Sequence, residues 1–365
     1  MKNINKILII IQRSNGDVFL SLSLINALFR HFGSPNIDLL VNEDTKSVAK
    51  LLPNINTIHT FSYIKKKNKR FSQEKELISS IYKKYDLSIN LTSSDRSVIY
   101  ACLGGKKSIS AIEKNNKKSW WKKSLLSNYY IFNSSKHILQ NNLEPLNLLG
   151  IEHELIQGSI DRVKKNISNI EIKLRNMKIN KFIIFHPSAQ YDYKILPQHL
   201  RDELLLLLSS LGIPILITGS NNEIDMKIKM TLKVLPNIHD FIGETSINEF
   251  FILSNLALAY IGMDTLNMHI AASQNKRIFA IFGPTNLSMW SPWSNSLKAC
   301  TTKNSPIQTY GNVTIFQADM PCIACGKAGC DDNHGKSDCL FNIKPDIIFN
   351  KVEAWLKGLE LETTL

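Results

Sequence analysis

Hydrophobic and polar positions alternate along the chain in blocks that predict strands and helices in turn. Residues 6–11 (KILIII) form a continuous apolar and β-branched run, which is typical of a strand buried on both faces. A polar loop follows, and then a helical pattern from Val18 to about His31. Later strand-like runs, separated by helical patterns such as 74–84, lie at 37–41, 58–61 and 87–91. This order predicts a parallel sheet with helices on both faces.

The second half of the chain repeats this alternation of predicted strands and helices. Strands are predicted at 182–185, 214–218, 238–242, 256–261 and 277–282. Helices are predicted at 197–211, 223–235, 247–254, 265–273 and 345–359. The stretch 160–180 is polar and lacks a buried strand, so it indicates a connection between domains. We therefore predict an α/β fold of two Rossmann-like, doubly wound domains at 1–165 and 166–344, with a final segment at 345–365.

Composition narrows the class of protein. The 365 residues are 44% hydrophobic and 21% charged, which excludes disordered, collagen-like and coiled-coil chains. The longest uncharged stretch, 204–222, is interrupted by Gly212 and Pro214, so it predicts no membrane span. The first residues lack the small-residue cleavage site of a signal peptide. We therefore expect a cytoplasmic protein with reduced thiols.

The charge is unevenly distributed. The net charge is +13, and residues 1–160 hold 23 Lys and Arg against 12 Asp and Glu, whereas the remainder holds 21 against 19. Two basic clusters account for much of the excess, and the second flanks Trp120 and Trp121: Lys65, Lys66, Lys67, Lys69 and Arg70, then Lys114, Lys117, Lys118, Lys122 and Lys123. Each cluster is either a solvated surface or a docking site for a polyanion or an anionic membrane leaflet.

Residues that carry chemistry follow the predicted strands of the second half. Ser188 and Lys194 lie in the loop after 182–185, and Glu223 begins the helix after 214–218. Gly262-Met263-Asp264-Thr265 leads into a helix whose free amides are suited to a pyrophosphate, with His269 one turn in. The ordinary alternatives are a solvated lysine, a first-turn glutamate and a structural histidine.

Asp17 lies at the start of a helix after the first strand. It is either a helix cap or, if it faces substrate, a carboxylate that takes a proton from an attacking hydroxyl.

Four cysteines share a loop rich in Gly, Asp and Lys within 321–340. They are Cys322, Cys325, Cys330 and Cys339. The first pair has the spacing of zinc ligands, so a structural zinc site is one interpretation. A disulfide or free thiols are the others. Cys102 and Cys300 read as small hydrophobic residues.

These motifs together resemble the bacterial lipopolysaccharide heptosyltransferases, glycosyltransferase family nine. The resemblance is carried by Ser14-Asn15-Gly16-Asp17, Lys194, Asp264-Thr265 with His269-Ile270-Ala271-Ala272, and Phe282-Gly283-Pro284-Thr285. The cysteine segment is similar to one in the heptosyltransferase III branch. The resemblance implies a GT-B architecture, with two domains facing across a cleft and the last helix returning to the first domain. It also implies inverting transfer from ADP-heptose to an acidic lipopolysaccharide core or glycolipid acceptor, at the inner face of the bacterial inner membrane.

The resemblance implies a role for each matching residue. Asp17 would be the general base, and Lys194 would hold the diphosphate. The other implied donor-binding residues are Ser188, Glu223, Asp264, Thr265, His269, Gly283, Pro284 and Thr285. The implied acceptor-binding residues are Arg13, Ser14, Lys65, Lys66, Lys67, Lys69, Arg70 and Arg96. No Asp-x-Asp triplet is present, so we expect no catalytic metal or other cofactor for catalysis, and zinc only as a structural ion.

Other interpretations remain open at this stage. Leu266 replaces the glycine usual in the family after Asp-Thr, which favours a branch that uses another nucleotide sugar for O-antigen or capsule synthesis. A non-catalytic protein that binds anionic ligands or a membrane surface would explain the basic half but not the strand-end motifs. A nucleotide-sugar epimerase is a further alternative, although G-x-G-x-x-G is absent after the first strand. Nucleic acid is not the expected partner.

Overall fold

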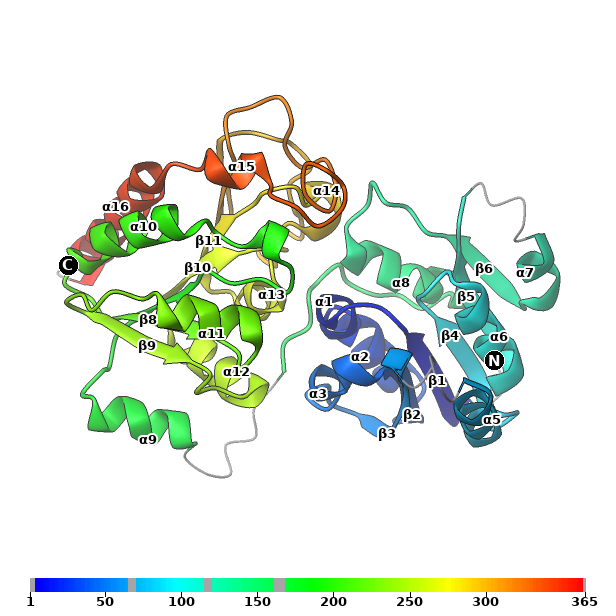
Figure 1. Ribbon diagram of the computed structural model, residues 1–365. Coiled ribbons are helices and arrows are strands. Elements are labelled where there is room, and N and C mark those ends of the chain that lie inside the picture. Colours follow the sequence, from blue (N-terminus) through cyan, green and yellow to red (C-terminus); the bar gives the residue numbers. More distant parts are fainter. Residues whose placement is uncertain (1–3, 65–69, 115–119, 161–167, 364–365) are drawn as a thin grey trace. The chain divides into compact units, whose positions relative to one another are not determined.

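The computed structural model describes residues 4–64, 70–114, 120–160 and 168–363, and its contacts divide the chain into two units (Figure 1). The units are residues 1–161 and 162–365. Each unit contains one largely parallel sheet with helices packed against it. The predicted α/β class with two Rossmann-like domains is therefore confirmed. The division falls within 161–167, which lie outside the described residues, a few positions before the predicted boundary.

The first unit is a six-stranded sheet in the order β3-β2-β1-β4-β5-β6, and every neighbouring pair is parallel. The strands are β1 (Lys6–Ile11), β2 (Asn36–Asn42), β3 (Ile55–Phe61), β4 (Tyr85–Asn90), β5 (Gly105–Ile112) and β6 (Asn128–Ile131). The α-helices are α1 (Asn15–Phe19), α2 (Leu22–His31), α3 (Lys46–Ala49), α5 (Arg70–Ile81), α6 (Asp95–Gly104), α7 (Trp120–Leu125) and α8 (Ile138–Leu149).

The second unit is a seven-stranded sheet in the order β12-β13-β11-β10-β7-β8-β9, parallel except for the β12–β13 hairpin. The strands are β7 (Ile183–His186), β8 (Ile215–Gly219), β9 (Ile238–Ile242), β10 (Ala259–Met263), β11 (Arg277–Ile281), β12 (Ile307–Tyr310) and β13 (Val313–Phe316). The α-helices are α9 (Asn169–Asn176), α10 (Gln198–Ser209), α11 (Glu223–Met230), α12 (Ile247–Leu256), α13 (Leu266–Ser273), α14 (Leu287–Trp290), α15 (Asp338–Phe341) and α16 (Pro345–Thr363).

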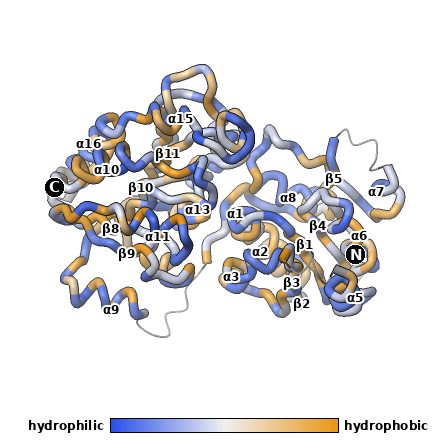
Figure 2. The backbone as a smooth tube through the Cα atoms, in the orientation of Figure 1, coloured by the Kyte–Doolittle hydropathy of each residue, from blue (hydrophilic) through white to orange (hydrophobic). Residues whose placement is uncertain are grey.

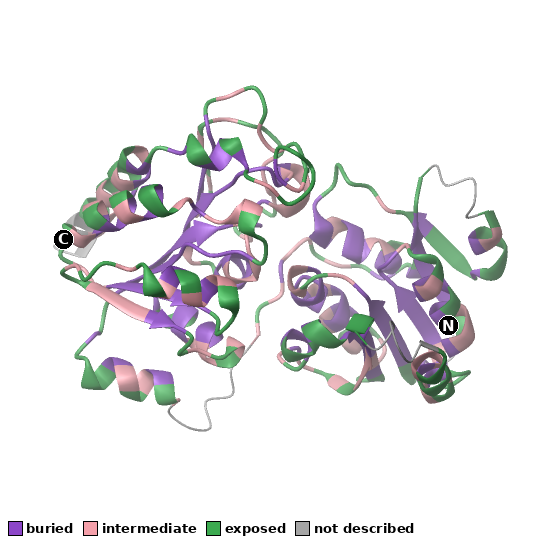
Figure 3. Cartoon of the chain, viewed as in Figure 1, coloured by how far each residue is buried: buried purple, intermediate pink, exposed green. Residues whose placement is uncertain are grey.

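Buried strands form the centre of each unit, and exposure is concentrated on helices and loops (Figure 3). Ile7 to Ile10 of β1 are completely buried, as the continuous apolar run predicts. Within the described residues, no helix is long and apolar enough to cross a bilayer.

Two predicted segments differ in detail from the structure. The helical pattern after β1 is divided into α1 and α2, because the Ser21 hydroxyl donates to the Val18 carbonyl and competes with the helical ladder. The stretch interpreted as a connection contains α9, which starts at a capping box between Ser168 and Glu171. Along α9, where Figure 2 shows hydrophobic and hydrophilic residues in turn, Ile170 and Leu174 lie one helical turn apart and are buried.

The last helix packs against the core of the second unit, and its expected return to the first domain stays a prediction. Helix α16 packs on α10, and Ile348 and Val352 belong to the same buried cluster as Leu204. The ring of Trp355 lies 5.6 Å from that of Phe279 in β11. The apolar side of α16 is thus buried in the second unit, which is where its hydrophobic contribution to stability arises.

Gly262 in β10 provides a test of this packing. A Cβ atom at Gly262 would lie 2.4 Å from the backbone oxygen of His186 in the neighbouring strand β7. We expect Gly262→Ala to lower the free energy of unfolding by about 2 kcal/mol, measured by urea denaturation, because backbone atoms must move apart. Gly358→Ala in α16 is the matched control, since nothing lies within 4 Å of its added methyl group. Equal stability of the two variants would contradict the argument.

Candidate functional site

In the second unit, polar side chains gather at the carboxyl ends of β7 and β10. These strands are neighbours, and Gly262 pairs with His186 near their ends. The loop after β7 contains a 3₁₀ turn, Asp192–Lys194, from which Lys194 Nζ reaches to 3.4 Å from Asp264 Oδ2. The structure therefore brings together Lys194 and Asp264, which the sequence predicted to act on the same donor.

The helix that follows β10 presents its amino end at the same place. Thr265 is the N-cap of α13, with extended backbone, and its side chain makes no capping hydrogen bond. Its hydroxyl oxygen instead lies 3.4 Å from the Tyr260 hydroxyl. The first-turn amides of α13, together with the Lys194 cation, form an arrangement that favours an anionic group.

Ser188 and Glu223 differ from each other in their surroundings, and their predicted contacts with the donor stay predictions. Ser188 is buried and donates to Asp225, a carboxylate that also accepts hydrogen bonds from Ser220 and Asn222. Asp225 is therefore a neighbour of Ser188 that sequence reasoning missed. Glu223 is exposed and forms a 2.8 Å ion pair with Lys227, whose hydrogen bond and charge lower the pKa of Glu223. Its geometry is that of a surface residue in a first helical turn.

Two histidines near this edge are buried. Burial lowers the pKa of His186 to about 4, although the charge of nearby Asp225 opposes the shift. Its Nδ1 lies 3.1 Å from Thr218 Oγ1, so the neutral ring is held by a buried hydroxyl. His269 is buried in α13, and its ring centroid lies 6.2 Å from that of Trp290. His269 thus packs in the interior of the second unit.

The cysteine loop is hydrogen-bonded to the loop after β11 and to the loop after β7. Ala324 N donates to Gly283 O at 3.2 Å, and Gly326 N donates to Pro284 O at 2.7 Å. Thr285, at the end of the same turn, is buried. At the loop's other end, Ser337 Oγ donates to Tyr193 O at 2.6 Å, next to Lys194.

All six cysteines are free thiols, so the disulfide interpretation of the loop is not the arrangement found. Burial, together with the neighbouring Cys330 and Cys325 thiols, raises the pKa of Cys339 to about 11. Among the described residues, no three His, Cys, Asp or Glu side chains are arranged to hold a metal ion. Zinc bound by Cys322, Cys325, Cys330 and Cys339 stays a prediction.

In the first unit, the loop after β1 places Asp17 at the amino end of α1. Asp17 is only 3% exposed and completes a capping box with Ser14, whose hydroxyl donates to Asp17 Oδ2 at 2.6 Å. Arg13 Nε lies 2.8 Å from Asp17 Oδ1, and the Arg13 guanidinium lies 4.9 Å from the centroid of the Phe132 ring. Arg13, Ser14 and Asp17 therefore form one cluster.

Sequence reasoning missed polar residues beside this cluster. Gln12 is buried, and within the described part of the chain neither its side-chain nitrogen nor its side-chain oxygen has a hydrogen-bond partner. Asn42 Nδ2 donates to Arg13 O at 3.2 Å, and Gln12 N donates to Thr92 Oγ1 at 3.0 Å. The sequence did contain one signal for these residues, because Gln12 is a polar residue directly after a buried strand.

The predicted acceptor cations other than Arg13 divide into three groups. Arg96 lies with its guanidinium carbon 3.7 Å from the Phe61 ring centroid and donates to the Tyr63 hydroxyl at 2.8 Å. Arg70 is the first residue of α5. The remaining four, Lys65, Lys66, Lys67 and Lys69, lie outside the described residues.

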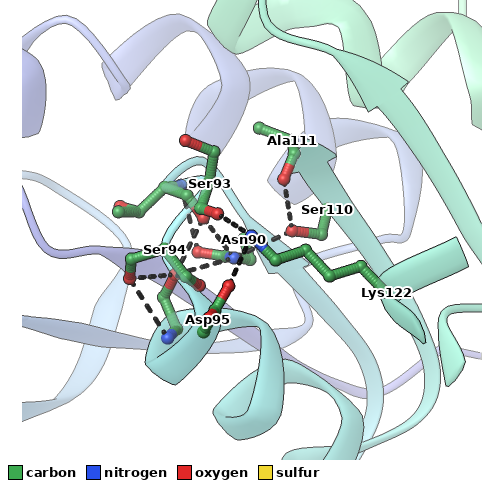
Figure 4. A network of polar contacts seen from close by, with 9 residues as sticks. Asn90, Ser93, Ser94, Asp95, Ser110, Ala111 and Lys122 are labelled. Atoms are coloured by element: carbon green, nitrogen blue, oxygen red, sulfur yellow. Dashed lines mark hydrogen bonds and ion pairs between the residues drawn. The ribbon is translucent and has the colours of Figure 1, made fainter. Parts of the chain in front are cut away.

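One cation of the second basic cluster is internal. Lys122 of α7 is 1% exposed, and its Nζ contacts Ser93 O at 2.6 Å and Asp95 Oδ1 at 2.8 Å (Figure 4). Asn90 and Ser110 lie in the same polar network at the ends of β4 and β5. Lys122 therefore ties α7 to the loop after β4, whereas the sequence grouped it with surface charges.

Comparisons with known proteins identify the family. Residues 75–318 match the model of glycosyltransferase family 9 (heptosyltransferase). A lipopolysaccharide heptosyltransferase 3 of Escherichia coli strain K12 is 25% identical over 295 residues, which cover 78% of this chain and 84% of that protein. The chain belongs to glycosyltransferase family 9.

Solved structures of similar fold agree with this assignment. The E. coli ADP-heptose lipopolysaccharide heptosyltransferase II is 17% identical with a TM-score of 0.67, covering 97% of this chain and 99% of that one. E. coli heptosyltransferase WaaC with ADP-2-deoxy-2-fluoro heptose is 15% identical with a TM-score of 0.64, covering 92% and 98%. The fold of the chain is GT-B.

Burial of His186 predicts a dependence of stability on pH. The unfolded chain protonates this histidine near its ordinary value of 6.5, but the folded chain only near 4, so the free energy of unfolding falls as pH drops from 6.5 to 4. The contribution is roughly 3 kcal/mol. His186→Gln should reduce the slope of unfolding free energy against pH in that window, measured by urea denaturation. The same change at exposed His31 should leave the slope unaltered, and identical slopes for both variants would refute the assignment.

Proposed function

We propose that this protein transfers heptose from ADP-heptose to a hydroxyl of an acidic lipopolysaccharide core or related surface-glycan acceptor, with inversion at the anomeric carbon. The observation that carries the proposal is the placement of Lys194 and Asp264 at the amino end of α13, in a chain of family 9. The names of the relatives support the choice of donor and acceptor class. The reaction is proposed to occur on the cytoplasmic side of the inner membrane.

The second unit would hold the donor. A diphosphate placed against the first turn of α13 meets free amides, and Lys194 adds a mobile positive charge. The ion pair with Asp264 keeps that lysine at the site before the donor binds. As the bond between the sugar and the diphosphate breaks, negative charge grows on the leaving phosphate. The amides and Lys194 stabilise that charge more than they stabilise the intact donor.

The first unit would activate the acceptor. Asp17 takes the proton of the acceptor hydroxyl while its oxygen attacks the anomeric carbon from the face opposite the leaving diphosphate. The new glycosidic bond forms as the old bond breaks, and ADP leaves. Arg13 and Ser14 stabilise the ionised carboxylate that the base requires. The proposal uses no metal ion, in keeping with the missing Asp-x-Asp triplet.

A different nucleotide sugar is the second candidate. Leu266, the first residue of α13, stands beside the amides proposed to hold the diphosphate, where the family usually has glycine. A side chain there narrows the space for phosphate oxygens. A panel of nucleotide sugars in a transfer assay, with ADP-heptose first, distinguishes the two candidates.

Asp17→Asn tests the general base. The amide keeps the shape of the carboxylate but cannot accept the proton, so we expect kcat to fall by about 10²- to 10⁴-fold. Thermal stabilisation by ADP-heptose should persist, because the donor is held by the other unit. Asp44→Asn, at an exposed aspartate in the same unit, is the control and should transfer normally. Wild-type turnover by a correctly folded Asp17→Asn variant would exclude the role.

Lys194→Ala tests the stabilisation of the leaving group. We expect kcat/KM for the donor to fall by about 10²- to 10³-fold, because one charge next to the developing phosphate charge is lost. Lys194→Arg should restore part of it. Lys227→Ala is the matched control, since Lys227 is an exposed lysine of the second unit that pairs with Glu223. If Lys194→Ala and Lys227→Ala have equal activity, Lys194 does not hold the diphosphate.

A further inference from the structure

Exposed apolar side chains of the first unit are concentrated on one side of its sheet. Connections from β3 onward place α5, α6 and α7 in one layer, where α5 contacts α6 and α6 contacts α7. The opposite side carries α2 and α8, which contact each other. Among the described residues, this opposite layer exposes only one large apolar side chain, Leu148.

The α5–α6–α7 side is very different. We name as the apolar–basic face the exposed side chains Phe71, Ile99, Trp120, Leu125, Tyr129 and Ile131, together with the lysines around them. Phe71 is 88% exposed and Trp120 71%, so neither packs in the core. Edge strand β6 adds Tyr129 on this side, because Lys123 of α7 lies over its ring at 5.6 Å. Soluble proteins seldom expose a group of large apolar side chains without an interaction partner.

The same segment contains the whole excess charge of the unit. Residues 61–131 have 16 Lys and Arg against 5 Asp and Glu, whereas the other residues of 1–160 have 7 of each. Several of these cations are exposed on the described elements of the layer and its edges: Lys75, Lys83, Lys84, Lys106, Lys107, Lys114 and Lys123. Lys122 is the exception, since it is buried in the polar network of Figure 4.

We propose that the apolar–basic face binds the surface of an anionic phospholipid bilayer. Aromatic side chains suit the boundary between headgroups and acyl chains, where one end of the ring is apolar and the other is solvated. Lysines extend their stems over apolar surface and place their charges among anionic headgroups. A nucleic acid would satisfy the charges but would leave Leu125 and Ile131 in water. A combination of exposed aliphatic, aromatic and cationic side chains therefore favours a bilayer.

The proposal deepens the membrane location given above and rests on it, but it does not depend on the roles of Asp17 or Lys194. Binding to the bilayer would hold the enzyme where an acceptor with a lipid anchor is found. It would raise the encounter rate with that acceptor without changing the chemistry of transfer.

Vesicle co-sedimentation tests the apolar part of the face. Wild-type protein should bind vesicles that contain phosphatidylglycerol and should bind pure phosphatidylcholine vesicles weakly. Trp120→Ser combined with Leu125→Ser should weaken binding about tenfold, because insertion of apolar side chains is lost. Leu206→Ser in α10 is the control, since Leu206 is 60% exposed and Leu125 is 59%. Absence of wild-type binding, or equal binding by variant and control, would overturn the proposal.

Charge reversal tests the basic part. Lys114→Glu with Lys123→Glu should reduce the affinity for phosphatidylglycerol vesicles by about tenfold or more, and added salt should weaken wild-type binding. Lys46→Glu with Lys50→Glu, at exposed lysines at the two ends of α3, is the matched control and should have a smaller effect. Equal loss in both pairs would show that net charge alone binds the vesicles, and the assignment to this face would be wrong.

Transfer to a water-soluble, truncated acceptor separates this proposal from the proposed function. Variants of the apolar–basic face should lose vesicle binding and keep wild-type kcat and KM with the soluble acceptor. Asp17→Asn should keep vesicle binding and lose transfer to the soluble acceptor. If no nucleotide sugar supports transfer, but the variants of the apolar–basic face lose vesicle binding and the controls do not, the proposed function is wrong and the membrane-binding proposal is supported. RNA is the competing ligand. If the protein binds RNA as tightly as phosphatidylglycerol vesicles, and if the Trp120→Ser/Leu125→Ser variant binds RNA as tightly as wild type, the assignment of the apolar–basic face to a bilayer would be overturned.

Discussion

The close approach of β10 to β7 at Gly262 is the constraint from which the donor side is built. With no Cβ at this position, the His186 carbonyl lies in the space that a side chain would occupy. The two strands therefore end at the same level, and the loops after them begin side by side. Lys194 and Asp264 lie on these two loops and contact each other, although they are 70 positions apart in the chain. Gly262 thus contributes to the proposed donor site through the packing of the two strands.

The cysteine loop adds a second constraint at the same edge. Its backbone amides bond to the carbonyls of Gly283 and Pro284, and its Ser337 hydroxyl bonds to Tyr193. The His334 ring lies 5.5 Å from that of Tyr193. Every one of these contacts falls on a loop that follows a central strand. The loop therefore restrains the turns on both sides of the α13 amino end.

How far the sequence predicted this arrangement depends on the kind of information each residue needs. Lys194 and Asp264 could be placed together because both follow buried strands, and parallel strands of one sheet end at a common edge. The hydrogen bond from Ser188 to Asp225 could not be foreseen, because it depends on how α11 is rotated about its own axis. The burial of Lys122 could not be predicted either. A lysine next to other lysines is normally interpreted as a surface residue, and its buried position follows only from its contacts with Ser93 and Asp95.

Strands at or next to the sheet edges were the other elements that the sequence did not predict. Strand β5 begins with Gly-Lys-Lys and alternates polar with apolar residues, so it lacks the continuous apolar run that marked β1. The β12–β13 hairpin is short, and its outer strand is partly exposed. For α16 the periodicity was correct, but it did not predict α10 as the packing partner. An amphipathic pattern specifies which residues are buried and leaves open the surface against which they pack.

The contacts of Asp17 contribute to stability and also constrain the role of general base proposed for it. A carboxylate at 3% exposure is stable only if its charge is compensated, and Arg13 and Ser14 supply that compensation. Those contacts also occupy both carboxylate oxygens, so an acceptor hydroxyl must share or replace one of them. Arg13 is the partner able to yield, because it contacts Asp17 through a single side-chain ion pair, whereas Ser14 donates to Asp17 through both its hydroxyl and its backbone N–H in the capping box. A cation displaced in this way remains beside the anionic acceptor, where its charge is still compensated.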